Sequence, residues 1–247
     1  RAQELGERLL PGVGRVLAFL VVLGGLVFNV GNVAGCGLGL NAMLGVDPMW
    51  GGVASALIAT GIFLAPRAGV AMDRLVVVLG FLMIALTGYV AWVSGPPVGA
   101  ALRNAVLPER VDFLALTTLV GGTVGGYITY AGAHRLVDAG VRGAEHATEI
   151  ARASVTGVLV TGAMRVLLFL AVLGVVAAGV SLDPVNPTAS AFEAAAGEFG
   201  LRAFGLILWA AALTSVIGAS YTSVSFLTSF GPGLARRKGA LVVAFIA

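Results

Sequence analysis

Long apolar runs recur along this 247-residue chain, and they constrain its fold more than any other feature. About 20 apolar residues let an α-helix cross the hydrocarbon core of a bilayer, at about 1.5 Å of rise per residue. The runs lack the period-two alternation that β-barrel strands show over about 10 residues. We therefore expect an all-α membrane protein with one transmembrane domain over residues 1–247. Its predicted spans, the fourth broken and the last incomplete, are residues 16–40, 49–65, 75–94, 113–137, 155–180, 200–229 and 239–247.

The overall composition agrees with this prediction. Hydrophobic residues make up 58% of the chain and charged residues 11%, with a mean hydropathy of +0.99. Soluble domains contain roughly 45–50% apolar and about 25% charged residues, so a soluble fold could not bury this much apolar surface. The net charge of +3 is too small to indicate a nucleic-acid partner, and the single cysteine, Cys36, excludes an internal disulfide framework. The partner that the composition predicts is the lipid bilayer.

Loops rich in basic residues alternate along the chain with loops that carry acidic residues. This alternation predicts the orientation of the chain in the membrane. Arg67 and Arg74 follow the second predicted span, and the basic run 236–238 follows the sixth. Asp183 and Glu193 lie in a loop that this pattern places on the other side. Because short cytoplasmic loops are enriched in Lys and Arg, we expect the N-terminal end of the chain on the cytoplasmic side of the cell membrane.

The fourth predicted span is rich in glycine. Residues 119–134 contain five glycines, two threonines and two tyrosines, a composition that disfavours one continuous helix. Broken helices with free carbonyl groups form ion sites near the bilayer midplane in many secondary transporters. Small residues spaced by three or four positions also let two helices pack closely. Both interpretations stay open from composition alone.

Three further polar residues of the spans are candidates for a transport pathway. Asn29 and Asn32 are three residues apart and share a helix face, where each forms an interhelical hydrogen bond or lines a polar pathway. His134 lies at the cytoplasmic end of the fourth span, where it is either an interfacial residue or part of that pathway. No pair of histidines at helical spacing, no intramembrane pair of aspartates and no Ser–His arrangement is evident, so we do not expect an enzyme.

The order of several segments resembles the Nramp divalent-metal transporters. The segments Glu4–Arg8, Gly39–Val46 and Pro97–Arg103, with the glycine-rich fourth span, are similar to the third to sixth helices of that family, and Gly205–Ser220 is similar to its eighth. The resemblance implies a LeuT-type inverted-repeat transporter fold of five-helix units. The chain would then begin at about the third helix and stop at the start of the ninth, with both ends truncated and the Asp-Pro-Gly-Asn metal motif of the first helix absent.

The resemblance also implies a metal site on the fourth span. The Met-Pro-His motif of the family falls on Thr129, Tyr130 and Ala131, and a carbonyl ligand falls on Gly126, but the chain departs from the motif at all three positions. Thioethers prefer soft or borderline metals, whereas hydroxyl and carbonyl oxygens suit hard cations. We therefore expect weaker selection against hard ions. Tyr127 and Tyr130 either contact the water shell of the ion or pack against neighbouring helices.

Asn29 and Asn32 fall where typical family members have acidic residues of a proton pathway, and an amide does not exchange a proton near neutral pH. These departures are similar to the Nramp-related magnesium transporters. That branch is implied to move Mg²⁺ or Mn²⁺ by alternating access without proton coupling, with no cofactor besides the transported ion. Two alternatives remain, a proton-coupled Mn²⁺ or Fe²⁺ transporter and an amino-acid or other organic-solute carrier of the same fold.

Overall fold

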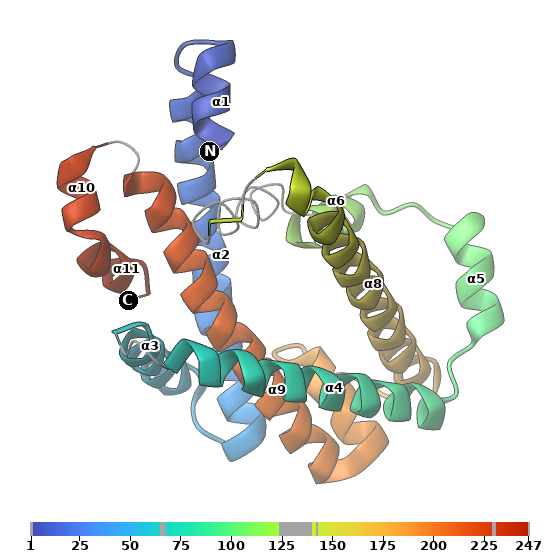
Figure 1. The fold of residues 1–247 in the computed structure, drawn as a ribbon. Coiled ribbons are helices and arrows are strands. Elements are labelled where there is room, and N and C mark those ends of the chain that lie inside the picture. The colour runs from blue at the N-terminus through green and yellow to red at the C-terminus, as the bar shows by residue number, and fades with distance from the viewer. Residues whose placement is uncertain (1, 65–67, 124–139, 142, 229–230, 247) are drawn as a thin grey trace. The chain divides into compact units, whose positions relative to one another are not determined.

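The computed structural model describes residues 2–64, 68–123, 140–141, 143–228 and 231–246. Every regular element in these ranges is helical, which confirms the all-α prediction for this part of the chain (Figure 1). The elements are α1 (Ala2–Leu9), α2 (Val13–Leu44), α3 (Pro48–Leu64), α4 (Ala68–Ser94), α5 (Val98–Val106), α6 (Phe113–Thr123), the short 3-10 turn η1 (Ala144–His146), α8 (Ala147–Ala177), α9 (Pro187–Leu227), α10 (Pro232–Arg236) and α11 (Lys238–Ile246).

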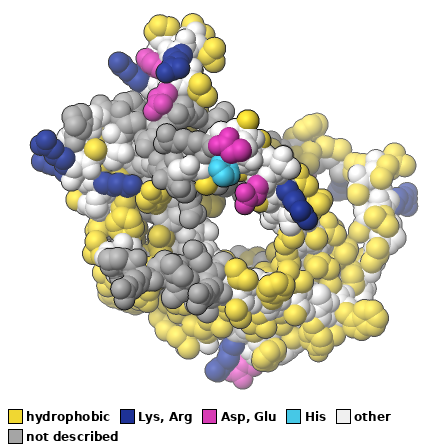
Figure 2. Space-filling model, in the orientation of Figure 1, with side chains coloured by type: hydrophobic (Ala, Val, Ile, Leu, Met, Phe, Trp, Pro, Cys, Tyr) yellow, Lys and Arg dark blue, Asp and Glu magenta, His cyan; other side chains and the backbone are white. Residues whose placement is uncertain are grey.

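Four helical segments are long and apolar enough to cross a membrane, as judged by length and composition. They are Val13–Leu44, Val77–Ser94, Ala144–Ala177 and Pro187–Leu227, and α3 is a shorter apolar helix of 17 residues. Large apolar side chains are exposed on these segments, among them Leu159 and Phe169 of α8, as a lipid-facing surface requires. Figure 2 shows hydrophobic side chains over α4, in whose apolar part Val77–Ser94 the side chains of Val78 and Phe81 are 64% and 71% exposed.

Several helices extend beyond the apolar runs that predicted them. Helix α8 begins at Ala147, before the expected start at residue 155, and α9 begins at Pro187, before the expected start at residue 200. Polar residues flanking a span can stay helical once they leave the hydrocarbon, so apolarity does not mark the helix end. Gly197 has φ 62° and interrupts α9 just before the expected span. The number and bounds of the spans stay a prediction.

The chain divides into two compact units, and helices α2 and α9 contribute a part to each. The first unit comprises residues 1–31, 110–150 and 215–247, and the second comprises residues 32–109 and 151–214.

In the second unit, α2 and α9 pack antiparallel through glycines. A Cβ added at Gly39 would lie 2.6 Å from the backbone nitrogen of Trp209, and one at Gly205 would lie 2.6 Å from that of Met43. Trp209 also donates a hydrogen bond of 3.0 Å from Nε1 to Oγ of Ser55, which attaches α3 to α9. The apolar core of this unit lies beside the pair and comprises Ala42, Leu86, Val90, Ala171, Ala189, Phe192, Phe204 and Ile207.

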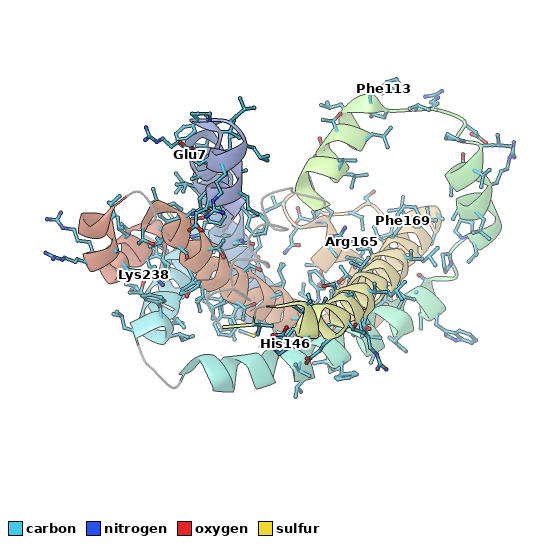
Figure 3. All side chains as sticks on the ribbon, turned by 45° about the horizontal axis from the view of Figure 1, so that its top comes forward. Glu7, Phe113, His146, Arg165, Phe169 and Lys238 are labelled. Carbon is cyan, nitrogen blue, oxygen red and sulfur yellow. The ribbon has the colours of Figure 1, made fainter. Side chains whose placement is uncertain are left out.

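In the first unit, the part of α2 that ends at Gly31 packs against the part of α9 that begins at Ser215. Ala18 and Val21 of α2 form a small apolar cluster with Phe226 of α9. Helix α11 joins them at its start, where Nζ of Lys238 lies 4.2 Å from the ring centroid of Tyr221 (Figure 3). The contacts again run antiparallel, because higher numbers on α2 meet lower numbers on α9.

Candidate functional site

The structure describes only part of the predicted site. Gly126, Tyr127, Thr129, Tyr130, Ala131 and His134 lie outside the described residues, so their predicted roles are not tested. Asn29 and Asn32 on α2 are described, and they differ in their surroundings.

Asn29 is the centre of a buried polar contact in the first unit. Its Nδ2 donates hydrogen bonds to Oγ of Ser220 at 3.0 Å and to the backbone carbonyl of Phe245 at 2.6 Å. Ser220 in turn donates to the carbonyl of Val216 at 2.7 Å. Asn29 is 2% exposed and Ser220 is fully buried. We call this set of Asn29, Ser220 and the Phe245 carbonyl the Asn29 node, which joins α2 to both α9 and α11.

The partners fix the orientation of the Asn29 amide. A backbone carbonyl only accepts hydrogen bonds, so the atom facing Phe245 must be the nitrogen. The hydroxyl hydrogen of Ser220 is directed to Val216, which leaves its oxygen to accept the second Nδ2 hydrogen. The Oδ1 of Asn29 is buried and has no hydrogen-bond partner in the described part of the chain.

Small residues allow the helices to approach closely enough to form the node. A Cβ at Gly25, one turn before Asn29, would collide with Oγ of Ser223, one turn after Ser220. Ser223 is fully buried, and its hydroxyl makes no hydrogen bond within the described ranges. Gly25 and Ser223 therefore serve close packing, whereas Asn29 and Ser220 supply the polar contact.

Other threonine hydroxyls along α9, in both units, bond to the backbone of their own helix. Thr222 donates to the carbonyl of Gly218 at 2.9 Å, and Thr214 donates to that of Ala211 at 2.9 Å. Such bonds satisfy a hydroxyl inside an apolar surrounding without a partner helix. Thr222 is 3% exposed. These hydroxyls tolerate burial and do not by themselves form a ligand site.

Asn32, in the second unit, is only half-buried. Its Nδ2 is enclosed and has no hydrogen-bond partner among the residues that the structure describes. The two asparagines thus share a helix face by spacing but not a bonding pattern. Among the described residues, the structure connects Asn29 to other helices and gives the enclosed Nδ2 of Asn32 no acceptor.

The chemistry of the node is that of neutral hydrogen bonding. An amide, a hydroxyl and a carbonyl carry no charge near neutral pH, so they neither exchange protons nor balance the charge of a divalent ion. Within the described ranges, no group of three or more His, Cys, Asp or Glu could hold a metal ion. Ser220 belongs to a segment that the sequence analysis singled out, but its bond to Asn29 and the role of the Phe245 carbonyl were not predicted.

Comparison with known proteins identifies the family. The family model described as natural resistance-associated macrophage protein-like, or Nramp, matches residues 2–247. The chain belongs to the Nramp family. It is 52% identical over 246 residues to the uncharacterized membrane protein YcsG of Bacillus subtilis (strain 168), and 52% identical over 246 residues to an uncharacterized membrane protein of Haemophilus influenzae (strain ATCC 51907 / DSM 11121 / KW20 / Rd). No solved structure matches the chain.

Both alignments cover all of this chain but only part of each relative. The chain spans 61% of the length of the Bacillus protein and 62% of the length of the Haemophilus protein. Nramp proteins are membrane transporters of metal ions rather than enzymes, and the predicted resemblance to this family is confirmed. The assignment to the magnesium-transporting branch stays a proposal.

Proposed function

We propose that the complete protein moves divalent metal cations, Mg²⁺ or Mn²⁺, across the cell membrane by alternating access and without proton coupling. Membership of the Nramp family supports metal-ion transport. The observation that carries the lack of coupling is the Asn29 node. Both hydrogens of its Nδ2 are used in bonds to Ser220 and Phe245, at a position where the resemblance implies an acidic residue of a proton pathway.

A proton pathway needs groups that gain and lose protons, and the chain offers few of them in the membrane. The seven predicted spans contain no Asp or Glu. The acceptors that face Asn29 favour a hydrogen-bond donor, so the surroundings of this position also suit a neutral amide better than a carboxylate. Residue type and environment thus favour the same uncoupled mechanism.

The preference for a hard cation rests on the predicted site residues of the fourth span. Thr129 and Tyr130 offer hydroxyls and Gly126 offers a carbonyl, whereas the resemblance places the thioether of the family motif at Thr129 and its imidazole at Ala131, whose side chain has no ligand atom. Oxygen ligands and retained water suit Mg²⁺ and Mn²⁺, and Mg²⁺ in particular gives up its water reluctantly. Further ligands are expected from the first-helix motif of the family, which does not occur in these 247 residues.

A carrier of organic anions is the second candidate, and one residue favours it. Arg165 lies well inside α8, one turn before Phe169 (Figure 3), within the segment 155–180 that we predict to span the membrane. Ionisable residues inside membrane spans are costly and often mark a substrate pathway. A guanidinium group is permanently charged and binds a carboxylate in a bidentate geometry. A fixed positive charge suits such an anion better than a metal cation.

Uptake by the complete protein in proteoliposomes distinguishes the two candidates. Entry of Mg²⁺ and Mn²⁺ is expected, and the variant Thr129→Met should shift the preference towards Cd²⁺ because it restores a thioether. Arg165→Gln should leave metal entry intact. If no metal enters, while uptake of a small carboxylate is present and is abolished by Arg165→Gln, the metal proposal is wrong and the carrier of organic anions replaces it.

A further inference from the structure

Helix α5 has two chemically different faces. Val98, Leu102 and Val106 follow each other at four-residue spacing, so they lie along one side of the helix. Ala100 and Asn104 lie on the opposite side, with Arg103 between the two faces. Asn104 is further engaged in the turn that ends the helix, because its Oδ1 accepts a hydrogen bond of 3.2 Å from the backbone of Glu109.

The apolar face of α5 is uncovered in the second unit. Val98, Leu102 and Val106 are 46%, 66% and 79% exposed, and α5 contains no buried residue. In a soluble protein, the apolar side of such a short helix normally packs on a core and is buried. The face therefore needs a partner that the described part of this unit does not provide.

The end of α4 places α5 at a membrane boundary. Trp92 and Tyr89, in the last two turns of α4, are 87% and 53% exposed. Exposed Trp and Tyr at the end of a membrane span are typical of the interface between hydrocarbon and water. Gly95, with φ 56°, and the two prolines after it end α4 and separate it from α5. These three residues span at most about 11 Å, so α5 starts close to that boundary.

We propose that α5 lies in the membrane–water interface, with Val98, Leu102 and Val106 against the acyl chains and Arg103 reaching the lipid headgroups. The occupant of the apolar face is then the lipid surface rather than another segment of protein. Amphipathic helices lie in this way when one face is apolar and the other is polar or charged. This placement of α5 is independent of which substrate the protein carries.

Single-cysteine labelling of the complete protein in liposomes tests this placement. Cys36 is replaced by Ala, together with any other cysteine of the complete protein. Cysteine is then introduced at Leu102 or Val106 on the apolar face, and at Ala100 or Arg103 as controls elsewhere on the helix. Each is labelled with an environment-sensitive fluorophore. All four residues are exposed, so their substitution should leave the fold intact. The elution volume of each variant in size-exclusion chromatography checks this.

The expected result is a pattern that follows the helix faces. Labels at 102 and 106 should show blue-shifted emission and quenching by spin-labelled lipids, whereas the label at 100 should be quenched by aqueous iodide, with 103 closer to 100 than to 102. Iodide quenching at every position would show a solvated helix and overturn the proposal. Shielding of 102 and 106 from both quenchers would show a covering protein segment, and it would overturn the proposal equally.

Discussion

Helices α2 and α9 pack against each other in both units, but by different chemistry. In the second unit the contact is made by glycines, with Gly39 against the backbone of Trp209 and Gly205 against that of Met43. In the first unit a close approach of Gly25 to Ser223 is joined by a buried amide, with Asn29 bonded to Ser220. The first kind of contact depends on shape, and the second on matching hydrogen-bond donors and acceptors.

These two kinds of contact indicate which part of the α2–α9 pair serves packing alone and which part is a candidate for function. Close backbone approach stabilises helix pairs in membranes through van der Waals contact, and it needs no polar group. A buried amide costs free energy unless it is bonded, so its presence requires a specific partner set. We infer that the glycine contacts hold the pair together, and that the Asn29 node marks the part of the pair relevant to transport.

The largest effect is expected from filling the glycine contact. Gly205→Leu places a side chain where a Cβ alone would lie 2.6 Å from the nitrogen of Met43 and 2.8 Å from the carbonyl oxygen of Gly39. Backbone atoms cannot move aside easily, so the substitution should destabilise the fold by about 3 kcal/mol or more. Thermal unfolding in detergent measures this. Gly88→Leu on α4, where nothing lies within 4 Å of an added Cβ, is the control, and equal losses in both variants would disprove the packing role.

A smaller loss is expected from removing the amide. Asn29→Leu breaks the bonds to Ser220 and Phe245 and leaves the Phe245 carbonyl without this donor. Interhelical hydrogen bonds in membranes contribute about 1 kcal/mol each, so a loss of about 1–2 kcal/mol should lower the unfolding temperature. Asn41→Leu, at an exposed asparagine of the same helix, should change it much less. An unchanged melting temperature for Asn29→Leu would mean that the node does not stabilise the helix contact.

The smallest effects distinguish the two buried serines. Ser220→Ala removes one acceptor of Asn29 while the bond to Phe245 remains, so a loss of about 0.5–1 kcal/mol is expected. Ser223→Ala should have almost no effect, because the Ser223 hydroxyl has no hydrogen-bond partner in the described part of the chain. Parallel thermal unfolding of the two variants tests the difference. A larger loss of stability for Ser223→Ala than for Ser220→Ala would mean that Ser223, and not Ser220, makes the polar contact between the helices.

The sequence predicted the all-α fold and the Nramp family because both rest on patterns that extend over many residues. The apolar runs indicated helices, and the order of several segments indicated the family. Helix ends were harder to predict, since α9 continues back to Pro187 through polar residues, beyond the apolar run. The partner of Asn29 on α11 could not be predicted, because a backbone carbonyl such as that of Phe245 leaves no mark in the sequence.

The two asparagines show the same limit within the candidate site. Their spacing of three residues predicted a shared helix face, but spacing carries no information on the partner of each side chain. Asn29 is bonded to two helices, while the Nδ2 of Asn32 is without a partner in the described ranges. Their predicted roles in a transport pathway stay predictions.

The central claim is metal transport without proton coupling, and simultaneous recording of metal entry and internal pH tests it most directly. The complete protein is reconstituted in proteoliposomes that contain a pH-sensitive dye, and Mg²⁺ or Mn²⁺ is added outside. For the wild-type protein we expect metal entry with no acidification of the interior. We also expect the rate of metal entry to stay the same when a pH gradient is imposed across the membrane. Metal-driven acidification, or metal entry that accelerates with an inward proton gradient, would contradict the claim.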